Sequence, residues 1–325
     1  MTQIKPNSNF TFLGGVSVHD NKDAIYQEYR NSWIKLPEKF VLRDFPMHLD
    51  IESTSCCNLN CVFCDKLPLL KKDQFGYLDF GLYKKIIDEA VEHRLWGLKL
   101  SYRGEPLLHK EIVRMVSYAK KKGILDVYFN TNGMLLNEDM SERLIDAGLD
   151  RISISVEGID KKEFEKHRMG ANFDTILANI NSLKELRKKN GVSHPKIRVQ
   201  TVCLPGINLE LYKRFWSPVC DEVAAIDYKD ESTRVKGIVQ DWACPQLWQR
   251  MTIEWDGTIL CCNNDDLHLL KSGNAKEKSI YDSWHSLKIQ EARCLHQSGR
   301  SHEVLACNGC PWRTAQINKI KSDIF

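Results

Sequence analysis

The chain has 325 residues, a length that suits about two domains or one barrel with an appendage. Its contents of 42% hydrophobic and 27% charged residues are typical of a folded globular protein and exclude a collagen-like or disordered chain. The 46 basic and 43 acidic residues give a net charge of +3, with both signs mixed along the sequence. This balance gives no support for a nucleic-acid partner, and we expect none.

No stretch reaches the ~18 consecutive apolar residues of a membrane helix, and the N-terminal sequence MTQIKPNSNF lacks the apolar region of a signal peptide. We therefore expect a cytoplasmic protein with no membrane partner. In a reducing compartment, the 12 cysteines favour metal binding or catalysis over disulfides. They form one group near residue 60 and one after residue 240, with only Cys203 and Cys220 between the groups.

Residues 1–45 carry aromatic residues among charges, and we interpret them as a partly helical segment that packs on the next domain. From residue 46 onward, short apolar runs alternate with amphipathic stretches, which is typical of repeated βα units and a parallel sheet. The expected strands cover residues 47–51, 97–101, 127–130, 151–156, 196–202 and 223–228. Apolar residues at 82, 86, 87, 90 and 91 fit one buried helix face, and Ser141 and Gly148 are candidate caps of a later, short helix.

Six such units predict an α/β fold with a partial (β/α)6 TIM barrel, because the closed barrel needs eight units. In barrels of this kind the working residues lie in the loops at the carboxyl ends of the strands. The alternation stops after residue 230, where a region rich in Cys, Trp and Gly begins. We therefore divide the chain into an N-terminal segment (1–45), the partial barrel (46–234), a small C-terminal β-hairpin/helix domain (235–313) and a tail (314–325).

The first cysteine group, Cys57-Asn-Leu-Asn-Cys61-Val-Phe-Cys64, follows the first expected strand with the spacing C-x3-C-x2-C. Three thiolates in one short loop can hold three irons of a [4Fe–4S] cluster and leave the fourth iron open. A zinc site that adds Asp65 or a histidine is the alternative. The loop and its position resemble those of the radical S-adenosylmethionine (SAM) enzymes. The resemblance implies that SAM binds the open iron and is cleaved to methionine and a 5′-deoxyadenosyl radical, which removes a hydrogen atom from the substrate.

Later segments resemble weaker motifs of that family. The structural alternatives are a plain βα turn at 102–106, a packed aromatic at Phe63 and a solvated cation at Arg168. The segment Tyr-Arg-Gly-Glu-Pro at 102–106 resembles the Gly-Gly-Glu-Pro motif that holds the SAM amino group, and Arg103 replaces its first glycine. The Arg103 side chain could then face a substrate anion. The segment Asn-Thr-Asn-Gly at 130–133 resembles a Thr-Asn-Gly turn of the family. The resemblance assigns to SAM the residues Phe63, Tyr102, Gly104, Glu105, Asn132, Ser155, Glu157 and Arg168.

The second cysteine group contains Cys244, Cys262 and the pair Cys307-Asn-Gly-Cys310. The segment Trp-Asp-Gly-Thr at 255–258 predicts a hairpin turn that brings Cys244 and Cys262 together on adjacent strands. Four such cysteines also match a structural zinc ribbon. The spacing C-x12-G-x4-C followed by C-x2-C resembles the SPASM/twitch extension of some radical SAM enzymes. The resemblance implies one auxiliary [4Fe–4S] cluster on these four cysteines, as in the shorter twitch form.

A cluster with every iron ligated suits electron transfer. The resemblance therefore implies a two-electron dehydrogenation of an alcohol in a polar small molecule, such as an amino-sugar or aminocyclitol. A general base is expected to take the hydroxyl proton, and the candidates are Tyr228, at the end of the last expected strand, and Asp230 and Glu231 just after it. The expected electron donor is a flavodoxin or ferredoxin.

Three other functions remain open from the sequence. An epimerase would return a hydrogen atom from a thiol, for which Cys203, Cys261 and Cys294 are candidates. A maturase of ribosomally made peptides is the second alternative, although residues 1–45 are short for a leader-binding domain. The third is a non-catalytic iron–sulfur electron carrier, which would bind SAM without cleaving it.

Overall fold

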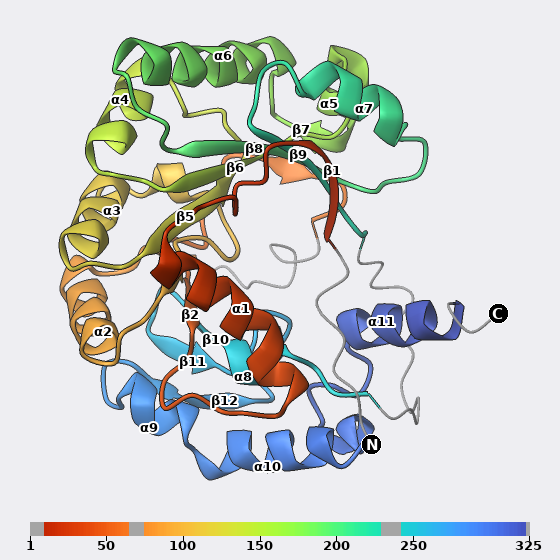
Figure 1. Ribbon diagram of the computed structural model, residues 1–325. Coiled ribbons are helices and arrows are strands. Elements are labelled where there is room, and N and C mark those ends of the chain that lie inside the picture. Colours follow the sequence, from red (N-terminus) through yellow and green to blue (C-terminus); the bar gives the residue numbers. More distant parts are fainter. Residues whose placement is uncertain (1–9, 65–74, 229–241, 323–325) are drawn as a thin grey trace.

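The computed structural model describes residues 10–64, 75–228 and 242–322, and its main feature is one curved sheet. The strands of this sheet are β1 (Phe10–Gly15), β2 (His48–Ile51), β4 (Gly97–Lys99), β5 (Asp126–Thr131), β6 (Arg151–Ser155), β8 (Lys196–Val202), β9 (Glu222–Ile226), β10 (Arg250–Ile253), β11 (Thr258–Leu260) and β12 (Lys271–Asn274). Their order is β1-β9-β8-β6-β5-β4-β2-β10-β11-β12 (Figure 1). A second sheet pairs β3 (Asn60–Cys61) with β7 (Arg168–Met169).

Six consecutive strands of the large sheet, β2, β4, β5, β6, β8 and β9, pair in parallel. The helices are α1 (Ala24–Glu38), α2 (Phe80–Glu92), α3 (Ile112–Lys121), α4 (Glu138–Asp146), α5 (Lys161–His167), α6 (Phe173–Lys189), α7 (Leu209–Trp216), α8 (Gln246–Gln249), α9 (Ile280–Trp284), α10 (Leu287–Gln297) and α11 (Pro311–Ser322), with short 3-10 turns at Pro106–Leu108 and Ser301–Glu303. Figure 1 shows α2, α3, α4 and α6 along the outer side of the curved sheet. The predicted α/β fold with a partial six-stranded barrel is confirmed.

Each strand expected between residues 47 and 228 is present, with bounds that differ by at most two residues. The predicted helix face also forms, because Leu82, Ile86, Ile87 and Ala90 of α2 are buried, whereas Val91 is half-buried. Burial of each such Leu or Ile side chain contributes roughly 1.5–3 kcal/mol relative to exposure. The apolar spacing in the sequence therefore reflects the contact between helix and sheet.

The expected cap at Ser141 is wrong. The N-cap of helix α4 lies four residues earlier, at Asn137, whose side-chain oxygen accepts the Met140 N–H at 2.9 Å. Asn and Ser are similarly good N-caps, and Ser141 instead lies buried inside the helix. The C-terminal signal is correct, since Gly148 has a φ of +79° just after the helix end.

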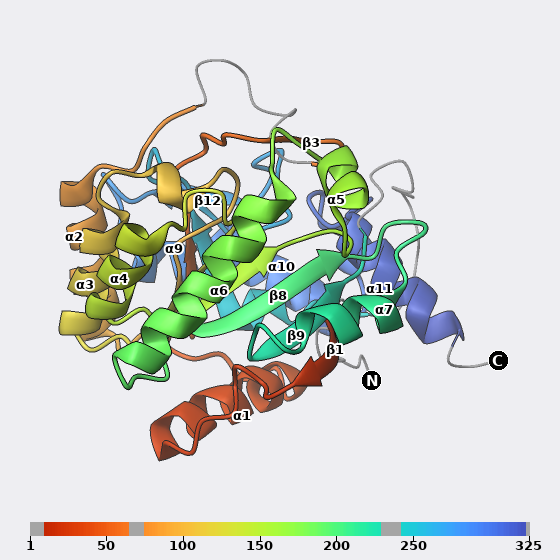
Figure 2. The same ribbon diagram turned by 90° about the horizontal axis from the view of Figure 1, so that it is seen from above.

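The N-terminal segment contributes both a helix and a strand to the barrel. Strand β1 pairs antiparallel with β9, an edge that the sequence analysis did not predict. Helix α1 buries Tyr26 and Tyr29 in a cluster with Met47, the residue just before β2. Figure 2 shows α1 at one end of the barrel and β3 at the opposite end, so α1 lies away from the carboxyl ends of the strands.

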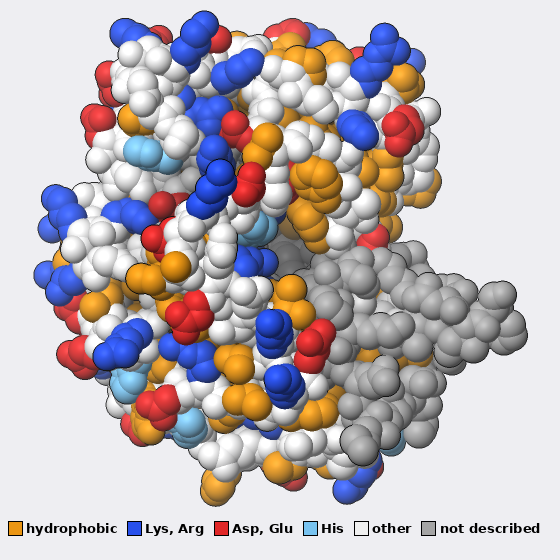
Figure 3. All heavy atoms as spheres, in the orientation of Figure 1, with side chains coloured by type: hydrophobic (Ala, Val, Ile, Leu, Met, Phe, Trp, Pro, Cys, Tyr) orange, Lys and Arg blue, Asp and Glu red, His pale blue; other side chains and the backbone are white. Residues whose placement is uncertain are grey.

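The strands of the C-terminal region continue the barrel sheet. Strand β10 pairs parallel with β2, with Arg250 opposite His48, and β11 and β12 follow in antiparallel pairing. The hairpin turn predicted at 255–258 is present, and its Gly257 has a φ of +92°. None of the described helices is both long and apolar enough to cross a membrane. Figure 3 shows acidic and basic side chains interspersed on the drawn face, as the net charge of +3 suggests.

Candidate active site

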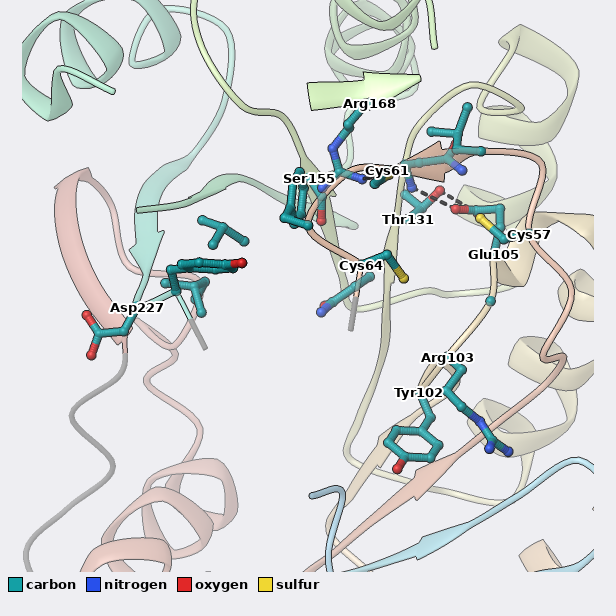
Figure 4. A pocket seen from close by; sticks show the side chains of 18 residues that line it. Cys57, Cys61, Cys64, Tyr102, Arg103, Glu105, Thr131, Ser155, Arg168 and Asp227 are labelled. Carbon is teal, nitrogen blue, oxygen red and sulfur yellow. Dashed lines mark hydrogen bonds between the residues drawn. The ribbon is translucent and has the colours of Figure 1, made fainter. Parts of the chain in front are cut away.

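A pocket with a volume of about 290 Å³ lies at the carboxyl ends of the parallel strands (Figure 4). Its lining comes from loops after β2, β4, β5 and β6 and from the ends of β8 and β9. The lining residues are Cys57, Leu59, Cys61, Phe63, Cys64, Tyr102, Arg103, Gly104, Glu105, Asn130, Thr131, Asn132, Ser155, Arg168, Val202, Ile226, Asp227 and Tyr228. All three cysteines of the first motif and every residue expected at SAM except Glu157 are therefore brought together.

The three cysteines of the C-x3-C-x2-C loop face this pocket and lie close enough for their charges to interact. Burial raises the pKa of Cys61 to about 11, and the Cys64 and Cys57 thiols add to the increase. Iron binding would deprotonate such thiols, so the donor set fits a cluster held by three thiolates. In the described parts of the chain, no three His, Cys, Asp or Glu side chains converge as the ligands of a single ion would.

Glu105 connects the loop after β4 to the loop after β5. Its fully buried carboxylate accepts the Thr131 hydroxyl at 2.6 Å, the Asn132 N–H at 2.7 Å and the Leu107 N–H at 3.1 Å (Figure 4). Burial raises the pKa of Glu105, and these hydrogen bonds oppose the increase. The carboxylate therefore fixes the shape of the pocket wall, a role for which the sequence offered no partner.

Gly104 is needed where the β4 loop crosses the cysteine loop. Its φ is +55°, and a Cβ there would lie 2.4 Å from the Thr54 carbonyl oxygen and 2.6 Å from that of Cys56. The next residue, Glu105, donates its N–H to the same Cys56 oxygen at 2.7 Å. The two loops are thus in direct backbone contact, and no side chain fits between them.

Arg103 does not reach toward a substrate anion as considered above. Its guanidinium forms two 2.7 Å hydrogen bonds with the Glu52 carboxylate and a further 2.7 Å ion pair with Glu254. Only 8% of Arg103 is exposed. The neighbouring Tyr102 donates its hydroxyl to Asp266 at 3.0 Å, so both residues join the barrel to the C-terminal region.

Arg168 and Glu157 act as a pair at the opposite wall. Glu157 is fully buried behind the pocket lining, where it binds the Arg168 guanidinium and accepts the Val202 N–H at 3.3 Å. The same guanidinium approaches the Cys61 sulfur at 3.7 Å and lies 5.3 Å from the Phe63 ring centre. Glu157 therefore orients Arg168 instead of facing the pocket.

The remaining predicted residues are Asn132, Ser155, Tyr228, Asp230 and Glu231. The Asn132 amide donates to the Asn58 side chain at 2.8 Å, and the Ser155 hydroxyl accepts from Gln200 at 3.5 Å. Tyr228 lines the pocket, whereas Asp230 and Glu231 lie outside the described residues. Asp227, which the sequence analysis missed, lines the side far from the cysteines (Figure 4). Its only sequence signal was its place at the end of the last strand.

A second group of thiols gathers in the C-terminal region. The charges of Cys244, Cys262, Cys307 and Cys310 interact with one another, which places the four sulfurs in one neighbourhood together with Cys261. Burial is the main cause that raises the pKa of Cys244 to about 12. Cys262 is the second residue after β11, but Cys244 lies before helix α8 and not on the strand adjacent to β11, so that detail of the expectation is wrong.

His296, which the sequence analysis did not single out, lies between two of these cysteines. The Cys244 N–H donates to His296 Nδ1 at 3.0 Å, and His296 Nε2 is 3.3 Å from Cys307 Sγ. Burial lowers the pKa of this histidine to about 3. Trp242, Trp312 and Ile317 form an apolar cluster that packs against Cys244 and Cys310. The site is thus a buried set of four thiols with a neutral histidine beside it.

Comparison with known proteins agrees with both sites. The family model of the Radical SAM superfamily matches residues 51–214, about half of the chain. The chain belongs to the radical SAM superfamily. A second model, the SPASM iron-sulfur cluster-binding domain, matches residues 244–311. The resemblance seen in the sequence is confirmed, and this radical SAM enzyme carries SAM-binding and auxiliary [4Fe–4S] sites.

Curated relatives of this radical SAM protein differ in what they are named for. It is 31% identical over 323 residues to a tungsten-containing aldehyde ferredoxin oxidoreductase cofactor-modifying protein of Pyrococcus furiosus, with 82% of this chain and 88% of that protein covered. It is 32% identical over 140 residues to a probable GTP 3′,8-cyclase of Methanococcus maripaludis. That match covers 41% of this chain and 44% of the cyclase, so the chain spans less than half of these cyclases.

Solved structures share the fold at low identity. BtrN in complex with AdoMet and 2-DOIA has a TM-score of 0.52 and 21% identity, with 80% of this chain and 89% of that chain covered. Streptococcus suis SuiB bound to its precursor peptide SuiA has a TM-score of 0.59 and 16% identity, with 93% and 79% covered. At these identities the likeness concerns the fold and not the substrate.

Proposed function

We propose that this radical SAM enzyme oxidises an alcohol of a polar small molecule, such as an amino-sugar or aminocyclitol, to a ketone. The observation that carries the proposal is the second set of four buried thiols, in a region whose strands continue the barrel sheet. A fully ligated cluster has no open iron for a substrate, and electron transfer is the chemistry left to it. The 2-DOIA bound to BtrN, a structure of the same fold, is compatible with such a substrate class.

In this proposal Cys57, Cys61 and Cys64 hold the SAM-binding cluster, and the four C-terminal cysteines hold one auxiliary cluster. The bound groups supply hydrogen-atom abstraction by a SAM-derived 5′-deoxyadenosyl radical and uptake of the second electron by the auxiliary cluster. The protein supplies position and excludes water. We assign SAM to the wall formed by Phe63, Tyr102, Gly104, Glu105, Asn132, Ser155 and Arg168, with Glu157 orienting Arg168.

The hydroxyl proton of the substrate needs an acceptor on the wall away from the cysteines. Asp227 and Tyr228 line that part of the pocket. The Asp227 carboxylate points away from the other labelled side chains (Figure 4), so Tyr228 remains the candidate base among the described residues. A flavodoxin or ferredoxin donor and a cytoplasmic location complete the proposal.

The positions of the spare thiols favour oxidation over epimerisation. An epimerase of this kind needs a thiol beside the substrate radical, but Cys203, Cys261 and Cys294 are all absent from the described lining of the pocket. Cys261 is fully buried among the C-terminal thiols, and Cys294 is exposed on α10. Neither Cys261 nor Cys294 is placed to return a hydrogen atom to a molecule in this pocket, whereas Cys203 directly follows the lining residue Val202 and is the thiol that an epimerase would use.

The test is an anaerobic assay that follows both 5′-deoxyadenosine and ketone with a panel of amino-sugars and aminocyclitols. The double variant Cys307→Ala/Cys310→Ala should keep 5′-deoxyadenosine formation and lose the ketone, whereas the matched control Cys294→Ala should keep both. Ketone formed in equal yield by the double variant would show that the C-terminal thiols have no part in the oxidation. Absence of 5′-deoxyadenosine from the wild-type enzyme with every substrate would refute the radical reaction itself.

A further inference from the structure

The contact between His296 and Cys307 has a defined direction. Nδ1 of His296 accepts the backbone N–H of Cys244 at 3.0 Å, so this nitrogen carries a lone pair and no proton. The single proton of a neutral ring is then on Nε2, which lies 3.3 Å from the Cys307 sulfur. A doubly protonated ring could not accept from Cys244, and the other neutral tautomer would lose the same bond. His296 is therefore an N–H donor to Cys307.

The ring is held in this orientation by its surroundings. His296 is fully buried in the last turn of α10, a helix that also buries Ile289 and Ala292. Arg293, one turn earlier, donates to the Leu247 carbonyl at 2.9 Å and to the Trp284 carbonyl at 2.8 Å, which fixes α10 against α8 and α9. The donor is thus directed at the sulfur by both packing and the Cys244 hydrogen bond.

We propose that His296 is a positioning residue that sets the reduction potential of the auxiliary cluster through its Nε2–H bond to Cys307. The inference rests on the part of the proposed function that makes Cys244 and Cys307 cluster ligands, and it does not depend on the substrate. A reduced cluster carries one more negative charge than an oxidised one, so its sulfurs accept a hydrogen bond more strongly. The donor therefore stabilises the reduced form and raises the potential, which favours electron uptake.

Two substitutions separate the two hydrogen bonds of the ring. His296→Asn keeps an acceptor near the Nδ1 position for the Cys244 N–H but has no donor that reaches Cys307. His296→Gln extends an amide N–H to the position of Nε2 and is the conservative variant. His285→Asn is the matched control, because His285 lies at the end of α9, where its ring is bonded to the Asp44 carbonyl at 2.8 Å.

The measurement is an EPR-monitored redox titration in a background with alanine at 57, 61 and 64, so that the auxiliary cluster alone gives a signal. We expect His296→Asn to lower the electron affinity of the cluster at least about tenfold, a shift of about 59 mV to more negative potential for one electron. His296→Gln should recover most of that shift, and His285→Asn should show none. A potential in His296→Asn equal to or above the wild-type value would overturn the proposal.

A second measurement covers the case in which His296→Asn fails to hold about four irons. Pulsed EPR of the reduced protein with unchanged His296 and ¹⁵N-labelled histidine should detect a weak coupling to a histidine nitrogen and to a proton that exchanges in D2O. Absence of both couplings would overturn the proposal. Neither measurement uses SAM or substrate, so a failure to form ketone would refute the dehydrogenase assignment and leave the role of His296 standing.

Discussion

The ion pairs of Arg103 give the sharpest test of how the barrel and the C-terminal region are joined. Arg103→Met would remove a guanidinium that is 8% exposed and would leave Glu52 and Glu254 adjacent without the cation they share, although His268 still contacts Glu254 at 3.1 Å. Loss of one partner from a buried ion pair typically costs about 3–5 kcal/mol. For a chain of 325 residues each 1 kcal/mol lowers the melting temperature by about 1.5 °C, so we expect a decrease of roughly 4–8 °C.

The assay is anaerobic thermal unfolding of the reconstituted protein, with three variants beside the wild type. Arg143→Met is the matched control, because its pair with Asp139 is solvent-exposed and should contribute about 0–1 kcal/mol. Adding Glu52→Gln to Arg103→Met should restore part of the melting temperature, since it removes one of the two adjacent carboxylate charges. A melting temperature of Arg103→Met within about 2 °C of the wild type would refute the reasoning, because a cost of 3 kcal/mol should give a larger decrease.

Three further predictions concern the iron content, the crossing of the two loops and the pH dependence. Anaerobic reconstitution should give about eight irons per chain, and alanine at all three cysteines of the C-x3-C-x2-C loop should leave about four, as an iron and sulfide assay would report; eight irons in that variant would contradict the assignment. Gly104→Ala should lower the unfolding free energy by about 1–3 kcal/mol, because the new Cβ would lie 2.4 Å from the Thr54 carbonyl oxygen. The same substitution should abolish SAM binding measured by calorimetry, and unchanged binding would contradict the loop contact. The hydrogen bond from His268 Nε2 to Glu254 at 3.1 Å raises the pKa of this histidine. The stabilisation that this bond contributes should be complete below about pH 6.5 and should disappear as the pH rises through the higher pKa of the folded state. If the melting temperatures of wild type and His268→Gln differ by the same amount at every pH from 5 to 9, this prediction is wrong.

The parts of the fold that were predicted from the sequence are those fixed by local pattern. The six parallel strands and the buried face of α2 follow from apolar periodicity, which can be recognised in the sequence without knowing which elements pack together. Strand β1 was missed because its burial is irregular and its pairing with β9 joins residues more than 200 positions apart. The cap of α4 was misplaced because Asn137 and Ser141 are both capable caps and only the backbone distinguishes them.

The candidate site likewise contains residues that the sequence identifies and side-chain contacts that only the folded structure shows. Cysteines and glycines were found because their spacing is a property of the sequence, and Gly104 is required by a crossing of two backbones. Partnerships between side chains could not be predicted, since Glu105 with Thr131, Glu157 with Arg168 and His296 with Cys307 each depend on elements that meet only in the folded chain. Residues that a motif places near SAM can therefore turn out to support another residue, as Glu157 does.

The continuity of the sheet fixes the relative position of two cysteine sites that are far apart in the sequence and that the proposed oxidation uses together. Strand β2 leads into the loop of the first cysteines, and its neighbour β10 belongs to the hairpin whose end carries Cys262. Because paired strands cannot slip without losing their ladder, the pairing of β10 with β2 fixes the hairpin relative to the pocket. Arg103 and Tyr102 add direct bonds from the pocket loop to Glu254 and Asp266. An electron leaving a substrate in the pocket would therefore meet an acceptor whose position is set by the fold and not by the docking of a separate domain.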